Sequence, residues 1–281
     1  MFREIAIIAP GAMGSAVARR LLEHGIRVTT LLEGRSVESR RRADDAGMIG
    51  VEPTRLVEAD IIFSIVPPAQ ALPLAETIAP LLRQSHRKPI FVDCNAVSVE
   101  TVTRVAGVIE ASGAPFADAG IIGGPPVPGG AGPTFYMSGT PALELDALND
   151  VGLQTVVMEG PIGTASALKM SYAGITKGLT GIAAAMILAA VRGGAAASLH
   201  KELGLSQAQL LQRFGKSLPD MYPKAYRWVA EMREIAAFAG DDPASARLYQ
   251  ALADFYETIA DDYEGPQANT QAIDDFLRLK D

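Results

Sequence analysis

The sequence has a single cysteine, three histidines and fewer basic than acidic residues, and each scarcity excludes a class of protein. Cys94 alone cannot form an internal disulfide. His24, His86 and His200 are widely separated, so no pair has the spacing of zinc ligands and we expect no metal site. The formal net charge of −7 argues against binding to nucleic acid, which requires a basic face. A small anionic ligand is not excluded, because it needs only a local cluster of donors.

Long hydrophobic runs are also lacking. The apolar run over 178–191 has about 14 residues, fewer than the roughly 20 that span a membrane, and it predicts a buried helix instead. The first eight residues combine mixed charges with a short apolar run, a pattern unlike that of a signal peptide. Together with the lone cysteine, these features predict a cytoplasmic protein that does not act at a membrane.

Hydrophobic residues make up 48% of the 281, enough to bury the cores of two domains. The first 160 residues alternate apolar strand-like runs with amphipathic helical ones. This pattern predicts an α/β domain over 1–160 with a doubly wound, Rossmann-type parallel sheet. We expect strands at 5–9, 28–32, 60–66, 89–92 and 115–119, two late strands at 134–138 and 155–157, and helices at 12–24 and 99–110.

The pattern changes after Gly163, beyond which no further strand-like runs bounded by turn residues occur. Residues 161–281 are therefore predicted to form an all-helical domain. We expect helices at 165–192, 207–216, 224–239, 243–262 and 270–279.

The turn after the first strand has the composition of a phosphate-binding loop. Gly11 lets a phosphate approach the backbone, the helix N-terminus supplies free N–H groups, and Gly14 permits close helix–strand packing. Ala9 stands where the dinucleotide fingerprint has its first glycine, so an ordinary structural turn is the alternative. The turn residues that we expect to bind the cofactor are Pro10, Gly11, Ala12, Met13 and Gly14.

The end of the second strand bears on the choice between NAD and NADP. An acidic residue here, such as Glu33, would hold the ribose 2′-hydroxyl of NAD, whereas Arg35 with Ser36 offers a cradle for the 2′-phosphate of NADP. We favour NADP and keep NAD as the alternative. The neighbouring arginines at 40–42 are explained equally well as the solvated face of a short helix.

Four segments, in order, resemble the β-hydroxyacid dehydrogenase superfamily, which includes 6-phosphogluconate and 3-hydroxyisobutyrate dehydrogenases. They are the glycine turn 9–15, Phe91-Val92-Asp93-Cys94-Asn95-Ala96-Val97-Ser98, Asp118-Ala119-Gly120-Ile121-Ile122-Gly123-Gly124, and the glycine-led segment 160–169 that ends in Lys169. The stretch 32–36 and the glycine- and proline-rich loop 123–130 are similar to a less characterised branch with a phosphogluconate-dehydrogenase-like C-terminal domain. The resemblance implies NADP, a catalytic Lys169 and a homodimer formed through the helical half.

Two positions depart from the family pattern. Ile122 replaces the serine that binds substrate, and Ala173 replaces the asparagine that works with the lysine. Tyr172 or Thr176, at helical spacing from Lys169, is a candidate to supply the missing donor. The alternative is that Lys169 extends to solvent and Tyr172 is an ordinary core residue.

Further candidate residues follow the strands, where open α/β sheets bind ligands. We expect Val66, Pro67 and Asn95 to contact the cofactor, and Asn95 to contact the substrate as well. Ile122, Gly123, Gly124 and Thr176 complete the expected substrate site. Glycines at 123 and 124 let backbone N–H groups line a ligand, although a flexible surface lid is an equally good explanation.

These observations predict an enzyme that transfers hydride between NADP and a small hydroxy acid or related carbonyl compound. Lys169 would donate or accept the proton, because a buried lysine titrates closer to neutrality than an exposed one. Two alternatives remain. An imine reductase would use the same scaffold with a more apolar pocket, and a non-catalytic module would bind NADP(H) without turnover.

Overall fold

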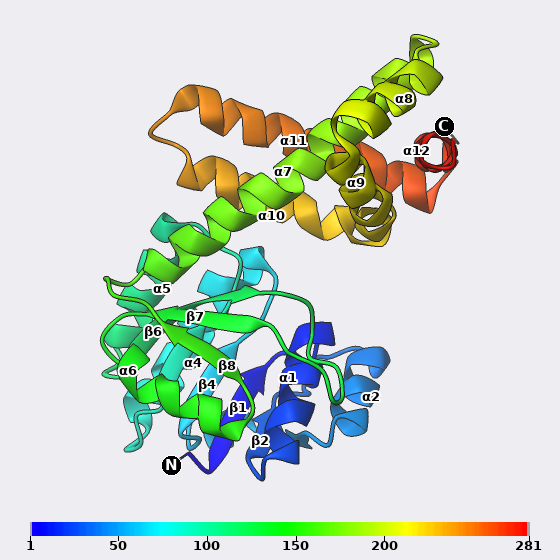
Figure 1. The fold of residues 1–281 in the computed structure, drawn as a ribbon. Coiled ribbons are helices and arrows are strands. Elements are labelled where there is room, and N and C mark those ends of the chain that lie inside the picture. The colour runs from blue at the N-terminus through cyan, green and yellow to red at the C-terminus, as the bar shows by residue number, and fades with distance from the viewer. Residues whose placement is uncertain (1, 280–281) are drawn as a thin grey trace. The chain divides into compact units, whose positions relative to one another are not determined.

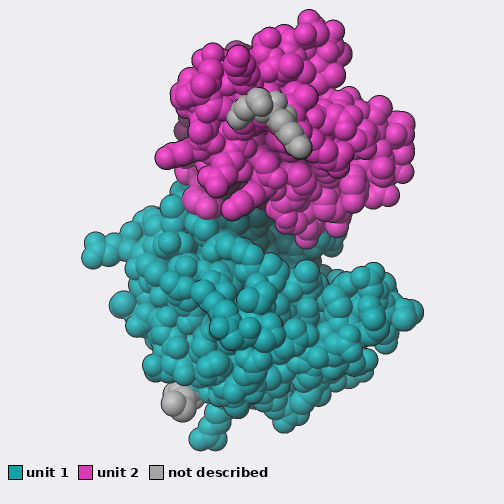
Figure 2. Space-filling model, turned by 45° about the vertical axis from the view of Figure 1, so that its right-hand side comes forward, with its two compact units in different colours: residues 1–170 teal, residues 171–281 magenta. Residues whose placement is uncertain are grey.

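The computed structural model describes residues 2–279, and the chain separates into two compact units, residues 1–170 and 171–281 (Figure 2). We expected a boundary near residue 160. The division falls instead inside the long helix α7 (Thr164–Arg192). The first turns of α7 belong to the first unit because backbone N–H groups of Gly163 and Ser166 donate to the Asp118 carboxylate on the sheet.

The first unit is built on one eight-stranded sheet in the order β3-β2-β1-β4-β5-β6-β7-β8 (Figure 1). Neighbouring strands are parallel except for the antiparallel pair β6 and β7, so the predicted doubly wound sheet is confirmed. The strands are β1 (Glu4–Ile8), β2 (Arg27–Thr30), β3 (Ile49–Gly50), β4 (Ile61–Ser64), β5 (Ile90–Asp93), β6 (Phe116–Ile122), β7 (Thr134–Ser138) and β8 (Gln154–Val157).

Helices cover both faces of this sheet, which explains why its central strands read as continuous apolar runs. Ile5 and Ile7 of β1 pack with α1 on one face, whereas Ala6 and Ile8 pack with α4 and α5 on the other. The helices of the first unit are α1 (Ala12–Glu23), α2 (Val37–Asp45), α3 (Pro53–Leu56), α4 (Ala71–Gln84), α5 (Val99–Glu110) and α6 (Ala142–Leu145), with 3-10 turns η1 (Pro68–Gln70) and η2 (Asp146–Val151).

The second unit is entirely helical over its described residues, as predicted. It holds most of α7, followed by α8 (Ala196–Ser206), α9 (Ala208–Met221), η3 (Tyr222–Lys224), α10 (Ala225–Phe238), α11 (Pro243–Glu264) and α12 (Ala268–Leu277). Glycines allow α7 to approach α11 closely: a Cβ at Gly174 would lie 2.9 Å from the Tyr249 hydroxyl, and one at Gly181 would lie 2.8 Å from Leu252. Lys177 of α7 also forms an ion pair with Glu231 of α10.

The predicted helix at 165–192 is confirmed as α7, which begins one residue earlier and contains the apolar run over 178–191. Among residues 2–279 it is the one helix that is long and apolar enough to cross a membrane by length and composition, with a mean hydropathy of 1.6 over its most apolar window. Its glycine-rich face packs on α11, as in the core helix of a helical domain.

Candidate active site

The candidate site lies at the carboxyl ends of the central strands. The strand order reverses between β1 and β4, the switch point at which doubly wound sheets bind ligands. The glycine turn follows β1, Val66 follows β4, Asn95 follows β5 and Ile122 ends β6. The sheet therefore brings the predicted residues of the first unit to one edge. β1 and β6 are three inter-strand spacings apart in the sheet, so the two strands are separated by about 14 Å.

The glycine turn has the geometry of a pyrophosphate site. Gly11 is the N-cap of α1 in extended conformation, and apart from its chain neighbours no residue lies within 4 Å of where its Cβ would be. The first helical hydrogen bond runs from Ser15 N to Gly11 O, so the N–H groups of the preceding turn point out of the helix end. No acidic residue stands in that turn. The open space and the donor set fit a bound dinucleotide phosphate.

Gly14 is required for packing, as predicted from its place in the turn. A Cβ at this position would lie 2.2 Å from the carbonyl oxygen of Ala9. Any side chain would therefore force α1 away from β1 and move the helix N-terminus that faces the phosphate site.

The loop after β2 places Glu33, Arg35 and Ser36 at the same edge. Glu33 is exposed in a turn, and Arg35 is partly buried. The Ser36 hydroxyl accepts a hydrogen bond from Ser39 N at 3.2 Å, so it caps α2. The Ser36 hydroxyl also donates to Ser39 Oγ at 3.2 Å, and its predicted contact with a 2′-phosphate stays a prediction.

Arg42 contributes a contact that the sequence left open. Its Nε donates to the carbonyl oxygen of Pro10 at 3.2 Å, which ties α2 to the glycine turn. Its guanidinium also bonds Ser39 Oγ and forms an ion pair with Glu38. The side chain of Arg42 is therefore part of the turn's support rather than only a solvated face.

Asn95 is buried and its side chain is committed to internal hydrogen bonds. Its Oδ1 accepts from Val66 N at 2.7 Å, and its Nδ2 donates to Ser64 Oγ at 2.8 Å and to Asp93 Oδ2 at 2.9 Å. This network holds the loop after β4, including Val66 and Pro67, against the end of β5. Asn95 thus shapes the site, and its predicted direct contact with cofactor or substrate stays a prediction.

Two buried carboxylates face each other on neighbouring strands, because Asp93 of β5 is in register with Asp118 of β6. Burial raises the pKa of Asp93 to about 7; hydrogen bonds from Asn95 oppose this rise and the negative charge of Asp118 adds to it. Burial also raises the pKa of Asp118, although hydrogen bonds from Ser166, Ser138 and Gly163 lower it in part. Burial of the neighbouring Cys94 thiol raises its pKa well above the ordinary value, which disfavours a nucleophilic thiolate.

The loop after β6 begins at the predicted substrate residues. Gly123 has a φ of +124°, and a Cβ there would meet Pro133 at 2.9 Å, so glycine is required. Gly124 has open space around it. The far part of the loop is tied to α1, because Arg20 Nη2 donates to the carbonyl oxygens of Val127 and Gly130 at 3.0 and 2.9 Å. The loop is therefore anchored to the helix that begins at the glycine turn.

Lys169 stands on the second turn of α7 and is partly buried. Its Nζ donates to the carbonyl oxygen of Ile121 at 2.6 Å. This bond directs the amine to the carboxyl end of β6, beside Ile122. The alternative in which Lys169 simply extends into solvent does not match this geometry.

Tyr172 and Thr176 lie further along α7, in the second unit. Tyr172 is 48% exposed, and the Thr176 hydroxyl donates to Tyr172 O at 2.8 Å. Tyr172 is thus not a core residue, and the proposed catalytic and substrate-binding roles of the two residues stay predictions.

Sequence reasoning missed the group that docks α7. Asp118 and Ser138 accept hydrogen bonds from the first N–H groups of this helix. One signal was present: Gly163 precedes the helix, and a glycine has no side chain with which to cap it. The sequence cannot say which distant strand supplies the missing acceptor.

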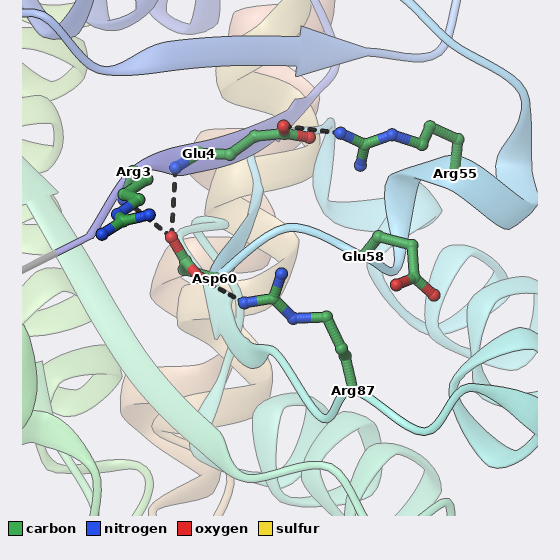
Figure 3. A pocket seen from close by; sticks show the side chains of 6 residues that line it. All are labelled: Arg3, Glu4, Arg55, Glu58, Asp60 and Arg87. Carbon is green, nitrogen blue, oxygen red and sulfur yellow. Dashed lines mark hydrogen bonds and ion pairs between the residues drawn. The ribbon is translucent and has the colours of Figure 1, made fainter.

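A cavity of about 540 Å³ lies at the opposite edge of the sheet (Figure 3). Asp60 accepts from the backbone N–H groups of Arg3 and Glu4 and from Arg87, while Glu4 pairs with Arg55. These arginines and carboxylates neutralise one another, so the cavity offers no uncompensated charge for a ligand. Among residues 2–279, no group of three or more His, Cys, Asp or Glu side chains is arranged to hold a metal ion.

Solved structures share this fold over nearly the whole chain. A conserved protein of unknown function, described as structurally similar to 3-hydroxyacid dehydrogenases, is 28% identical with a TM-score of 0.68, over 91% of this chain and 99% of that one. Mycobacterium tuberculosis 3-hydroxyisobutyrate dehydrogenase with L-serine has 19% identity and a TM-score of 0.70, over 99% and 100% of the two chains. An imine reductase from Myxococcus stipitatus in complex with NADP⁺ has 17% identity and a TM-score of 0.58, over 98% and 100%.

No curated protein matches the chain significantly. Residues 190–259 match a family described only as a domain of unknown function, within the helical unit. Residues 4–153 match the NAD binding domain of 6-phosphogluconate dehydrogenase, which agrees with the β-hydroxyacid dehydrogenase resemblance and supports an NAD(P)-dependent oxidoreductase. Because this match covers more than half of the chain, the chain belongs to the family of the NAD binding domain of 6-phosphogluconate dehydrogenase.

Proposed function

We propose that the protein is an NADP-dependent dehydrogenase or reductase that acts on a small hydroxy acid or a related carbonyl compound. The observation that supports this most directly is the Lys169 amine, held at the carboxyl end of β6 by Ile121 O at 2.6 Å. A bound nicotinamide supplies or accepts the hydride. The chain's own residues orient the reactants and move the proton.

The proton step follows from the position of Lys169. In the oxidative direction, neutral Lys169 accepts the substrate's hydroxyl proton as hydride leaves the carbinol carbon. In the reductive direction, the Lys169 ammonium donates a proton to the carbonyl oxygen as hydride arrives at the carbon. Ile121 O, which accepts a hydrogen bond from the amine, keeps Nζ near the same point in both directions.

The test is a spectrophotometric screen of hydroxy acids, ketones and imines with NADP(H) and NAD(H). On any compound that turns over, Lys169→Ala should lower kcat by about two to four orders of magnitude, as expected for loss of a positioned acid–base group. NADPH affinity should be unchanged. Lys201→Ala, a change at an exposed lysine on α8, is the matched control and should behave as wild type. Full turnover by Lys169→Ala would contradict the proposal, and NADPH binding without turnover of any compound would favour the non-catalytic module.

The preference for NADP rests on the loop after β2, where Arg35 and Ser36 accompany Glu33. Arg35 is partly buried at the sheet edge that holds the glycine turn, and a guanidinium pairs well with a phosphate. Arg35→Ala should weaken NADPH binding by about tenfold, the equivalent of ~1.4 kcal/mol, with little effect on NADH. Arg19→Ala, at an exposed arginine on α1, is the control. Tighter binding of NADH than of NADPH, unchanged in Arg35→Ala, would point to NAD instead.

A second candidate activity, imine reduction, is favoured by one feature of the site. Ile122 and Ala173 replace the polar anchors of hydroxy-acid dehydrogenases, which leaves a more apolar environment near Lys169. The same screen separates the two activities, because a hydroxy-acid dehydrogenase should turn over alcohols and an imine reductase only C=N compounds.

We also propose a homodimer formed through the helical unit. One face of α7 exposes large apolar side chains at helical spacing, among them Ile175 (68% exposed), Ile182 and Met186 (60% exposed). Surfaces of this kind are commonly covered by a second subunit. Light scattering should give a dimer for wild type and a monomer for Ile182→Glu/Met186→Glu. A wild-type monomer at assay concentration would refute this assembly.

A further inference from the structure

The N-terminus of α7 has no cap of its own. Gly163, the residue before the helix, has a φ of +99° and carries no side chain. In most helices the residue at this position accepts a hydrogen bond from the second or third N–H group. These donors in α7 must find acceptors elsewhere or remain unpaired inside the protein.

Two side chains of the sheet supply those acceptors. Asp118 Oδ2 accepts from Gly163 N at 3.0 Å and from Ser166 N at 2.9 Å. Ser138 Oγ accepts from Ala165 N at 3.1 Å and donates to Asp118 Oδ2 at 3.2 Å. The Ser166 hydroxyl donates to Asp118 Oδ1 at 2.7 Å. Asp118 and Ser138 are directly paired on the antiparallel strands β6 and β7, so one rigid pair caps the helix from outside.

The polarity of this network favours an ionised Asp118. Two backbone N–H groups and two serine hydroxyls donate to its two oxygens, and the N–H groups cannot accept a carboxyl proton. A negative charge at a helix N-terminus is also stabilised by the helix dipole. The carboxylate is fully buried, and its position is therefore set by these bonds rather than by solvent.

The same strand then fixes Lys169. Two residues beyond Asp118 on β6, a Cβ at Gly120 would lie 2.8 Å from Ala165 O and 3.2 Å from Lys169 Cβ. One residue further, Ile121 O accepts from Lys169 Nζ. Along β6, Asp118 caps the N-terminus of α7, Gly120 leaves room for the Lys169 side chain, and the carbonyl oxygen of Ile121 accepts a hydrogen bond from the amine.

We propose that Asp118 is a positioning residue for Lys169: by capping α7 from strand β6, it sets the depth and rotation at which the helix presents its lysine. The mechanistic use of that position rests on the proposed function. The positioning itself does not, and it can be measured without a substrate.

The first experiment is competitive acetylation of the intact protein, read by mass spectrometry as the ratio of labelling at Lys169 to labelling at Lys177. Lys177 is an internal reference because it lies on the same helix in an ion pair with Glu231. Asp118→Ala should raise the ratio by about tenfold, the scale expected for loss of charge-assisted hydrogen bonds. Asp118→Asn keeps an acceptor for the N–H groups and should raise the ratio less. Asp60→Ala removes a bonded carboxylate at the opposite sheet edge and should leave it unchanged.

General destabilisation would raise labelling at Lys177 as well as at Lys169, whereas loss of the cap should raise labelling at Lys169 with Lys177 near its wild-type level. An unchanged ratio in Asp118→Ala overturns the proposal. An equal rise in Asp60→Ala would overturn it too, because the effect would then not depend on the cap.

The second experiment measures turnover per NADPH-binding site. Asp118→Ala should lower kcat by about 10²-fold, the scale expected for misplacement of a catalytic group, with KM and NADPH affinity near wild type and partial recovery in Asp118→Asn. Normal kcat per site in Asp118→Ala would overturn the mechanistic part of the proposal. If wild type turns over no compound while the labelling ratio responds as expected, the proposed function fails and the positioning role stands.

Discussion

The two edges of the sheet in the first unit handle charge in opposite ways. At the amino edge, Asp60 is surrounded by Arg3, Glu4 and Arg87, and the Arg87 side chain is 58% exposed (Figure 3). At the carboxyl edge, Asp93 and Asp118 are buried and bonded by neutral donors rather than by cations. The partly exposed ion pair and hydrogen bonds of Asp60 join segments that are far apart in the sequence. Buried carboxylates hold N–H groups at fixed points, as the proposed binding and catalytic role of this edge requires.

The contrast extends to pH. Partial burial of Asp60 would raise its pKa, but hydrogen bonds from the backbone of Arg3 and Glu4 and the charge of Arg87 lower it overall. Asp60 therefore stabilises the fold at neutral pH, and this stabilisation is lost as pH falls through its folded pKa. Asp93, with its pKa raised to about 7, behaves in the opposite sense: its contribution is full in acid and is lost as pH rises through 7.

The largest expected effect is at Asp93. A carboxyl that titrates near 7 when folded loses about 4 kcal/mol of stabilisation between acid and pH 8 relative to an ordinary carboxyl. Asp93→Asn cannot ionise, so its free energy of unfolding should fall less over that range than that of wild type. Urea unfolding across the pH range measures the difference. Identical pH slopes for the two proteins would show that Asp93 is not the titrating group.

The next effect concerns the glycine turn. Gly14→Ala should lower the free energy of unfolding by about 1–3 kcal/mol, because its Cβ would overlap Ala9 O. Gly11→Ala is the matched control: its Cβ meets nothing within 4 Å, and we expect a change within about 0.5 kcal/mol. Denaturant unfolding of the two variants decides the matter. Equal losses would mean that the turn is not packed as described.

The smallest effect should occur at the amino edge. Arg87→Ala removes an exposed ion pair with Asp60 and should cost less than about 1 kcal/mol at neutral pH, less still at high salt. NADPH affinity should not change. A clear loss of cofactor binding in this variant would break the distinction between a structural and a functional edge.

Local sequence patterns were sufficient to predict the bounds of several helices and strands. The helix at 99–110 and the strand at 134–138 have the predicted bounds; Ser98 caps the former by accepting from Thr101 N. Helix α4 was not predicted, since Pro73 and Pro80 interrupt its apolar pattern, although both lie within the helix. Helix α8 was missed because its apolar residues are only weakly periodic.

Some features of the candidate site could likewise be predicted from local sequence, and others could not. The glycine turn and Lys169 were accessible from sequence because each lies in a recognisable local context. The cap formed by Asp118 and the bond from Arg42 to Pro10 join residues far apart in the chain, and their pairing depends on which strands become neighbours. Asn95 shows the converse: its place at a strand end was predicted, whereas its internal bonds follow from the neighbouring loop.

The most direct test of the functional edge is NADPH titration of Gly11→Val by protein fluorescence. The backbone of Gly11 is extended and the space beside it is open, so valine should fold there without strain while filling the place of a phosphate. We predict NADPH binding weakened by at least about tenfold, or ~1.4 kcal/mol, with an unchanged free energy of unfolding. Wild-type affinity in Gly11→Val would contradict cofactor binding at the glycine turn.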